Sequence, residues 1–205
     1  MGKIFCLMGK SASGKDTIYN RLLKSEILNL RHVVPYTTRP VRSGETEGET
    51  YFFCTDEKAD ELEKNGKIIE IRAYSTIHGI WKYFTVDDGQ ICLDQDNYLM
   101  IGTLEAYEKI RDYFGASRVC PIYIWADDGV RLERALKRER SQENPKYAEM
   151  CRRFLADEED FSRGNIEKAG IKMSFENTDI ESVLSEIQYY IKCEMLCPDS
   201  RDECL

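Results

Sequence analysis

Residues 3–17 read KIFCLMGKSASGKDT, and this stretch decides the fold. The apolar run at residues 4–8 predicts a buried strand, and residues 9–15 then match the phosphate-binding pattern G-x-x-x-x-G-K. A helical pattern follows at residues 16–24, with its apolar side chains on one side. Strand, glycine loop and helix in this order predict a loop that holds the phosphates of a nucleotide.

The residue types in this loop suit an anionic ligand. Glycines let the backbone turn its N–H groups inward around an anion, and the helix N-terminus adds a partial positive charge. Lys15 brings a full charge to the outer phosphates. The candidate nucleotide-binding residues of the loop are Gly9, Ser11, Ala12, Ser13, Gly14, Lys15, Asp16 and Thr17.

One loop position departs from the usual pattern. Ser or Thr commonly follows the lysine and helps to hold Mg²⁺, whereas this chain has Asp16 and then Thr17. Asp16 could hold metal-bound water, or it could cap the helix, where Asp is common. Thr17 can still offer a hydroxyl to a phosphate, so Asp16 or Thr17 is the candidate metal-binding residue.

Composition limits the function classes. The chain has 205 residues and a net charge of −8, which suits one α/β domain and argues against sequence-independent binding of nucleic acid. It has no run of 18 apolar residues and no charged-then-apolar leader, so we expect a cytoplasmic protein without a membrane partner. Oligomeric state stays open between monomer and homodimer.

Eight cysteines are present, and none forms a C-x-x-C pair. Cys6, Cys92 and Cys120 lie in apolar, strand-like runs, where a reduced thiol behaves as a small hydrophobic side chain. Cys193, Cys197 and Cys204, in or near the predicted polar tail at residues 195–205, could bind metal or form a disulfide, but a frayed tail fits their surroundings better.

Strand-like runs alternate with helical patterns along most of the chain, which predicts a mostly parallel sheet wrapped by helices. The expected strands are residues 4–8, 98–101, 119–124 and 171–175. The expected helices are residues 16–24, 104–113, 129–140, 146–159 and 179–191.

Two segments interrupt this alternation. Residues 34–87 predict a small inserted α+β lobe, suited to holding a second substrate, with antiparallel strands at 51–53, 68–71 and 81–85 and a helix at 56–65. Residues 138–150 are charged and irregular around Pro145 and predict a flap or lid. The core would then comprise residues 1–33 and 88–194, within a single domain at 1–194.

The inserted lobe begins with a cluster of phosphate-type donors. Residues 36–42 read YTTRPVR, which places Arg39 and Arg42 three residues apart, and Tyr51 follows. Forked arginine donors match phosphate oxygens in a bidentate way, and a phenol can add a further donor. A solvated loop with exposed arginines is the alternative.

These pieces together resemble guanylate kinase, a nucleoside monophosphate kinase family with a P-loop. The matching residues keep their order over about residues 3–191. They are the glycine loop, the run Thr37-Thr38-Arg39-Pro40-x-Arg42-x-Gly44-Glu45, then Gly48, Tyr51, Asn65-Gly66, Glu70, Arg134, Arg138, Arg153, Asn177 and Asp179.

The resemblance implies an acceptor site for GMP in the inserted lobe. Arg39, Arg42 and Tyr51 would grip the GMP phosphate, and Glu70 would read guanine. A carboxylate can accept from the ring N–H and the exocyclic amine of guanine together. The alternative for Glu70 is a strand carboxylate that faces water. His78 could face the nucleotide or lie at a strand edge.

The resemblance also implies how phosphate is transferred. Lys15, Arg39, Arg134, Arg138 and Arg153 would surround the phosphoryl group with positive charge, with Mg²⁺ bound to ATP. Surface ion pairs are the alternative for the arginines at 134 and beyond. Asn177 would lie near the ATP base, or it would cap the last helix.

Two departures from the family bear on the acceptor. Pro35 stands where the family has a serine that touches guanine, and a proline ring has no donor. At Gly102 the family's aspartate is absent. We expect ATP-dependent phosphorylation of GMP or dGMP. The alternatives are a related P-loop kinase for an acceptor such as ribose 1,5-bisphosphate and a non-catalytic guanylate kinase-like binding module.

Overall fold

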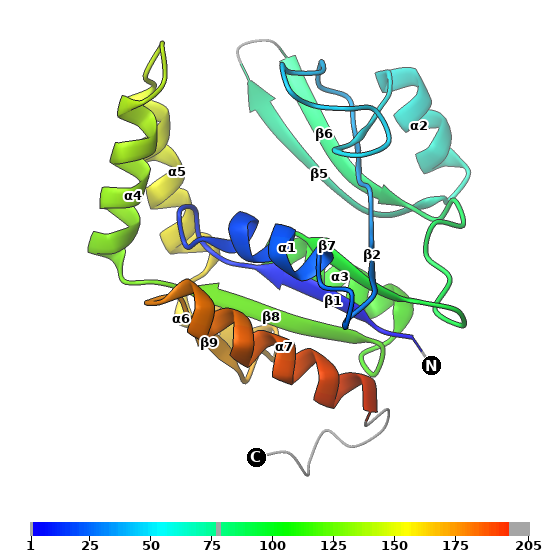
Figure 1. Ribbon diagram of the computed structural model, residues 1–205. Coiled ribbons are helices and arrows are strands. Elements are labelled where there is room, and N and C mark those ends of the chain that lie inside the picture. Colours follow the sequence, from blue (N-terminus) through cyan, green and yellow to red (C-terminus); the bar gives the residue numbers. More distant parts are fainter. Residues whose placement is uncertain (1, 77–78, 197–205) are drawn as a thin grey trace.

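Five parallel strands form the central sheet of the computed structural model, which describes residues 2–76 and 79–196 (Figure 1). Their order is β2-β7-β1-β8-β9, and β1 is buried along its whole length. The strands are β1 (Ile4–Met8), β2 (Leu30–His32), β7 (Asn97–Ile101), β8 (Val119–Trp125) and β9 (Ser174–Glu176). The predicted α/β fold with a parallel core sheet is confirmed.

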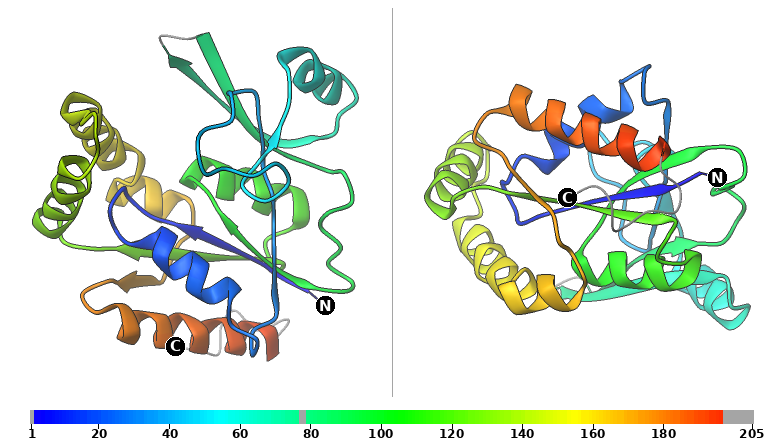
Figure 2. Two further views of the ribbon diagram at one scale, coloured as in Figure 1. Left: turned by 45° about the horizontal axis from the view of Figure 1, so that its top comes forward. Right: turned by 90° about the horizontal axis from the view of Figure 1, so that it is seen from below.

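Helices cover both faces of this sheet, as the view from below in Figure 2 shows. On one face, Phe5 and Leu7 of β1 pack with α1 (Lys15–Leu23) and α7 (Ile180–Leu196). On the other, Cys6 packs with α3 (Leu104–Phe114) and the region around α6 (Arg163–Lys168). Because side chains alternate along a strand, one apolar run serves both cores.

A second, four-stranded sheet lies between residues 36 and 86, in the order β4-β3-β6-β5. Its strands are β3 (Tyr36–Thr37), β4 (Phe52–Phe53), β5 (Ile68–Thr76) and β6 (Gly79–Val86), and α2 (Asp56–Lys64) packs on one side. The pairs β5–β6 and β3–β6 are antiparallel, but β3 and β4 are parallel. The expectation that all these strands are antiparallel was therefore wrong.

An irregularity in β5 turns its side chains towards the core. Ile68 pairs with Val86 and Glu70 with Thr85, so two steps along β5 face one step along β6. Ile68 packs in the cluster around α2, whereas Ile69 packs in the core cluster of the central sheet. This bulge also sets the face on which Glu70 lies.

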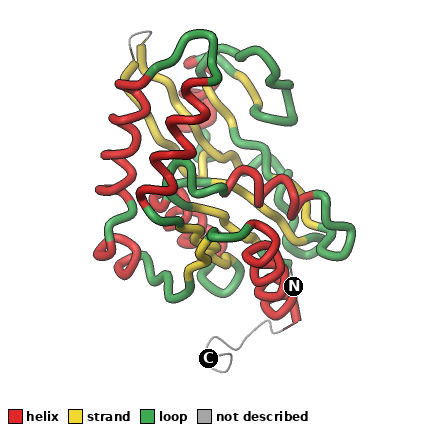
Figure 3. Tube along the Cα trace, turned by 60° about the vertical axis from the view of Figure 1, so that its left-hand side comes forward, coloured by secondary structure: helices red, strands yellow, loops and turns green. Residues whose placement is uncertain are grey.

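Two long helices, α4 (Asp128–Arg140) and α5 (Tyr147–Asp160), form the hairpin seen side by side in Figure 3. Only residues 141–146 between them are irregular, so the irregular stretch is shorter than the predicted 138–150. The carboxylate of Glu139 closes this connection by accepting from the backbone N–H of Lys146.

Two boundaries differ from the predicted ones. The strand expected at 171–175 is β9 at Ser174–Glu176, because Ile171 packs in the core before the strand begins. Helix α7 extends to Leu196, so residues 195–196 are helical and not part of a tail. Within the described residues, no helix combines the length and apolarity needed to span a membrane.

Candidate active site

The glycine loop between β1 and α1 has the conformation of a backbone cradle. Gly14 has a φ of 92°, and a Cβ there would lie 2.1 Å from Nδ2 of Asn177. Helix α1 begins at Lys15 with Gly14 before it, and no side chain caps it. Its first N–H groups therefore point at a potential anion. Gly14 holds the cap position and Asp16 lies in the first turn, so the alternative that Asp16 caps the helix was wrong.

Asn177 fixes the loop from the strand side. Its buried side chain donates to the carbonyl of Ser13 at 2.7 Å, and its own carbonyl accepts from Arg134 Nη2 at 3.2 Å. The carboxylate of Asp179 accepts from the N–H of Ser182 at the start of α7. The alternative of Asn177 as the cap of that helix was therefore wrong.

Two buried polar atoms at the loop have no hydrogen-bond partner within the described residues, namely Ser13 Oγ and Arg134 Nη1. Leaving a buried donor unpaired costs about 1–3 kcal/mol. Both atoms lie at the turn that leads into α1, since Arg134 Nη1 is 4.0 Å from the position of a Cβ on Gly14. Unpaired donors at this place are expected in a protein whose ligand accepts hydrogen bonds from them.

A buried arginine that the sequence analysis missed joins the loop to the helical hairpin. Arg131 of α4 is 0% exposed and donates from Nε to the carbonyl of Ser11 at 3.1 Å. Its other nitrogens reach Asp128 at 2.6 Å, Glu158 at 2.7 Å and Asp157 at 3.4 Å. One guanidinium therefore connects the loop to both α4 and α5.

Carboxylates at the C-terminal end of α5 bind the loop directly. Asp157 accepts from the backbone N–H of Ser11 at 2.6 Å, and Glu158 accepts from Lys10 Nζ at 2.6 Å. The only sequence signal for this contact is the acidic run at residues 157–160. Nothing local in the sequence pairs that run with a loop almost 150 positions earlier.

The other two lid arginines are not brought to the loop. Arg138 is exposed, and its side chain forms no ion pair within the described part of the chain. Arg153 is 45% exposed and lies 3.7 Å from Glu149 on its own helix. Only Arg134 of the three predicted lid arginines contacts the phosphate loop in this structure.

The predicted phosphate grip of the lobe is centred on Arg39. Its guanidinium is 3% exposed and lies over the rings of Tyr51, Phe53 and Tyr83, at 4.9, 5.6 and 6.0 Å from their centroids. Both of its terminal nitrogens donate to Glu45, and Nε has no partner among the described residues. Glu45 therefore occupies the fork that was predicted to hold phosphate.

These contacts shift the pKa values of the groups involved. The hydrogen bond from Arg39 lowers the pKa of Glu45, and burial raises the pKa of Tyr51. Arg42 lies close by, because its backbone N–H donates to Glu45 at 2.8 Å and its guanidinium is 5.8 Å from the ring centroid of Trp81. The structure thus brings the three predicted grip residues together.

Glu70 is a buried carboxylate in the same lobe. It is 1% exposed, accepts from Thr85 Oγ1 at 2.9 Å and pairs with Arg72 through Nε at 2.9 Å. The alternative of a carboxylate that faces water was therefore wrong. The residue predicted alongside it, His78, lies outside the described residues.

The Glu70–Arg72 pair lies next to the strand that leads into the phosphate loop. Burial raises the pKa of the Cys6 thiol of β1 to about 12, with further effects of opposite sign from Glu70 and Arg72. Burial raises the pKa of Tyr74, and the charges of Asp160 at the end of α5 and of Glu105 at the start of α3 raise it further. Strand β5 lies beside the central core, since Ile69 packs against the cluster that contains Cys6, and Lys109 of α3 donates to the carbonyl of Ile71 at 3.5 Å.

Candidate metal ligands are few. No group of three or more His, Cys, Asp or Glu side chains suited to a metal occurs within residues 2–76 and 79–196. Asp16 and Thr17 are exposed at the first turn of α1, and Asp16 lies 3.9 Å from Lys15 Nζ. Mg²⁺ commonly keeps several waters and takes one or two protein oxygens besides phosphates, so this donor set fits it.

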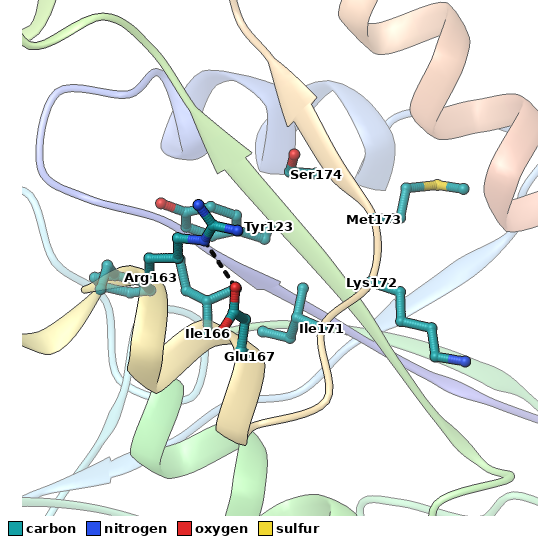
Figure 4. Close-up of a pocket in the computed structure, with 9 residues that line it drawn as sticks. Tyr123, Arg163, Ile166, Glu167, Ile171, Lys172, Met173 and Ser174 are labelled. Atoms are coloured by element: carbon teal, nitrogen blue, oxygen red, sulfur yellow. Dashed lines mark hydrogen bonds and ion pairs between the residues drawn. The ribbon is translucent and has the colours of Figure 1, made fainter.

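A recess of about 460 Å³ lies away from these clusters, beside β9 (Figure 4). Its lining includes the stacked rings of Tyr123 and Phe161, and Arg163, which pairs with Glu167 at 2.8 Å. It contains none of the predicted site residues.

Curated relatives of the chain are guanylate kinases from several bacteria. The proteins from Corynebacterium efficiens and Wolbachia pipientis wMel are 38% and 39% identical over 78 and 84 residues, which is 38% and 40% of this chain and 39% and 41% of theirs. That from Lactococcus lactis is 31% identical over 118 residues, 54% of this chain and 55% of the relative. The chain thus covers less than two thirds of each of these relatives.

A solved structure and a family model extend the likeness to most of the chain. The crystal structure of guanylate kinase from Anaplasma phagocytophilum superposes with a TM-score of 0.67 at 22% identity and covers 94% of this chain and 86% of that one. The family model described as guanylate kinase matches residues 1–194. The chain therefore belongs to the guanylate kinase family.

Proposed function

We propose that this protein transfers the terminal phosphate of ATP to GMP or dGMP by direct in-line displacement. The observation that carries the proposal is the combination of an uncapped phosphate loop with a buried, charge-paired carboxylate in the neighbouring lobe. Family membership supports this activity over the two alternatives, a different acceptor or a non-catalytic module.

The loop would hold the ATP phosphates. Backbone N–H groups of the loop and of the start of α1 would face the anion, apart from those of Ser11 and Ser13, which now donate to Asp157 and to the carbonyl of Lys10. A Cβ at Gly9 or Gly14 would collide with Ile124 or Asn177, so both positions need glycine. Ser13 Oγ and Arg134 Nη1 supply donors that are otherwise unsatisfied. Asn177, which holds the loop through Ser13, would also border the ATP base.

Transfer would need positive charge around the phosphoryl group and little covalent chemistry. Lys15 and Arg134 are already at the loop. Arg138 and Arg153 would join them when the α4–α5 hairpin closes, because their side chains are now exposed and held at most by a weak pair.

Arg39, Arg42 and Tyr51 would hold the GMP phosphate. Because Glu45 now occupies the Arg39 fork, phosphate would either replace this carboxylate or use the unpaired Nε and the Tyr51 hydroxyl. Glu70 would accept from the N–H groups of guanine. Both roles are proposals, as is a contact from His78.

Mg²⁺ would be held by Asp16 or Thr17 together with the phosphates of ATP. When bound, it would neutralise charge that develops on the phosphate oxygens. We further propose a cytoplasmic monomer or homodimer that binds small nucleotides and neither nucleic acid nor a membrane, which the net charge of −8 supports.

An acceptor panel tests the proposal. The wild-type protein is given ATP and Mg²⁺ with GMP, dGMP, IMP, AMP, UMP or ribose 1,5-bisphosphate, and ADP formation is measured by a coupled assay. The expected result is high kcat/KM for GMP or dGMP alone. Equal rates across the bases, or preference for the ribose bisphosphate, would refute the proposal.

A further inference from the structure

Arg72 forms a buried ion pair that the proposed role of Glu70 leaves unexplained. Its Nε and Nη2 donate to the two carboxylate oxygens of Glu70, at 2.9 and 3.2 Å. The Glu70 side chain is 0% exposed and that of Arg72 is 15% exposed. Burial is the largest single influence and lowers the pKa of Arg72, but the charge and the hydrogen bond of Glu70, with smaller contributions from Tyr74 and Tyr51, together raise the pKa overall. Arg72 therefore stays charged beside the Glu70 carboxylate.

The Glu70–Arg72 pair lies on one face of the β5–β6 hairpin. Glu70, Arg72 and Tyr74 are two residues apart along β5, so their side chains share one face, and Thr85 and Tyr83 oppose the first two on β6. The charge of Arg72 also lowers the pKa values of Tyr51 and Tyr74, although burial outweighs it. Arg72 thus shares its surroundings with the proposed phosphate grip.

Counting hydrogen bonds shows that Arg72 must respond when a base binds to Glu70. An ionised carboxylate offers about four lone-pair sites. Thr85 Oγ1 and the two Arg72 nitrogens use three of them, which leaves about one. Guanine brings two N–H groups to this carboxylate, so one present bond must yield. The longest, from Arg72 Nη2 at 3.2 Å, is the most readily exchanged.

We propose that Arg72 is a specificity-determining residue for the acceptor, a role that rests on the proposed function. It keeps its Nε bond to Glu70 and turns Nη2 to the carbonyl oxygen at C6 of the base. In guanine this carbonyl is next to the ring N–H that Glu70 would bind. The pair together presents acceptors and a donor in the order that matches a 6-oxopurine edge.

In this arrangement, Arg72 and Glu70 each recognise a different substituent of the purine base. Adenine carries an amine at C6, which would face guanidinium donors with donors of its own, so Arg72 selects for a 6-oxo group. The 2-amine of guanine, which hypoxanthine lacks, is read by Glu70 only. GMP and IMP therefore depend equally on Arg72 but differently on Glu70.

The experiment measures kcat and KM for GMP, IMP and AMP with ATP, in the wild type and in Arg72→Gln, Glu70→Gln and Thr85→Val. We expect Arg72→Gln to lower kcat/KM for GMP and IMP by the same factor, roughly 10- to 100-fold, mainly through KM. The GMP-to-IMP ratio stays constant, and the preference over AMP shrinks. Glu70→Gln instead shrinks the GMP-to-IMP ratio.

Controls keep the test decisive. Arg163→Gln, at an exposed position beside β9, should leave all constants unchanged. Arg72→Lys keeps the charge beside Glu70 but loses the fork, and it should show the same base profile if Arg72→Gln fails to fold. Thr85→Val removes a Glu70 donor without charge and should spare the preference over AMP.

Three outcomes would overturn the inference. They are GMP and IMP constants within twofold of wild type in Arg72→Gln, a loss in kcat with unchanged KM, or a shrinking GMP-to-IMP ratio like that of Glu70→Gln, which would make Arg72 a positioning residue. Failure of the wild type to phosphorylate GMP would refute the proposed function itself, so the two failures are distinguishable.

Discussion

Replacing Arg131 by methionine should weaken both the fold and the grip on ATP. The guanidinium is 0% exposed, contacts Ser11 and three carboxylates, and lies 4.5 Å from the ring centroid of Phe154. Methionine fills similar space without charge, so the change removes the guanidinium that joins the loop to both α4 and α5.

The size of the loss follows from the burial of the partners. Breaking a fully buried ion pair costs about 3–5 kcal/mol. Here Asp128 and Glu158 are 56% and 36% exposed, so water replaces part of the lost interaction, and Asp157 keeps its bond to Ser11. We therefore expect about 2–3 kcal/mol. For a chain of this size that corresponds to a Tm lower by about 4–12 °C.

Thermal unfolding and steady-state kinetics together test this prediction. KM for ATP should rise on the order of tenfold, because about 1.4 kcal/mol of loop ordering is lost, while KM for GMP changes less than about twofold. Arg163→Met, a matched arginine at a surface pair, should leave Tm unchanged. An Arg131→Met protein with wild-type Tm and wild-type KM for ATP would refute the reasoning.

Three further predictions concern single side chains. Lys15→Ala should lower kcat roughly 10²- to 10³-fold with an unchanged far-UV spectrum, and retained turnover would contradict the mechanism. Glu45→Gln should lower Tm by roughly 2–4 °C at pH 7. Because Arg39 lowers the pKa of Glu45 in the folded protein, the pair stabilises the fold at pH values above the unfolded-state pKa of 4.5. The Tm difference between wild type and variant should therefore vanish as the pH falls through the folded-state pKa of Glu45. A Tm difference that stays constant down to about pH 2 would contradict this. At pH 8, peptide mapping after thiol labelling should find Cys151 modified and Cys6 unmodified, since burial raises the pKa of Cys6 to about 12; labelling of both at equal rates would be contrary.

The features that the sequence predicted well are local ones. The strand, loop and helix at residues 4–23 follow from adjacent residues, and so does the periodicity of α3, α4 and α5. The short strands β2 and β3 and the six-residue α6 were missed, because two or three residues carry no periodic signal. The strands β2 and β3 exist because they pair with strands that are distant in the sequence.

The candidate site divides in the same way. Arg39 and Arg42 could be found as a cluster because they are three residues apart. Arg131 could not, because its partners on α5 and in the loop come together only in the folded chain. The orientation of Glu70 depends on a bulge in β5, and its buried position depends on the pair with Arg72. Neither can be read from the local sequence, so a water-facing carboxylate was an open alternative that the structure contradicts.

The central claim is that the phosphate loop and the lobe hold two nucleotides end to end. Inhibition by a linked adenosine–guanosine polyphosphate, measured against ATP and against GMP in turn, tests it most directly. We predict that the linked nucleotide competes with both substrates. We also predict that Lys15→Ala and Arg39→Gln each bind it more weakly than the wild type does, as measured by calorimetry. Competition with only one substrate, or equal binding by both variants and the wild type, would contradict it.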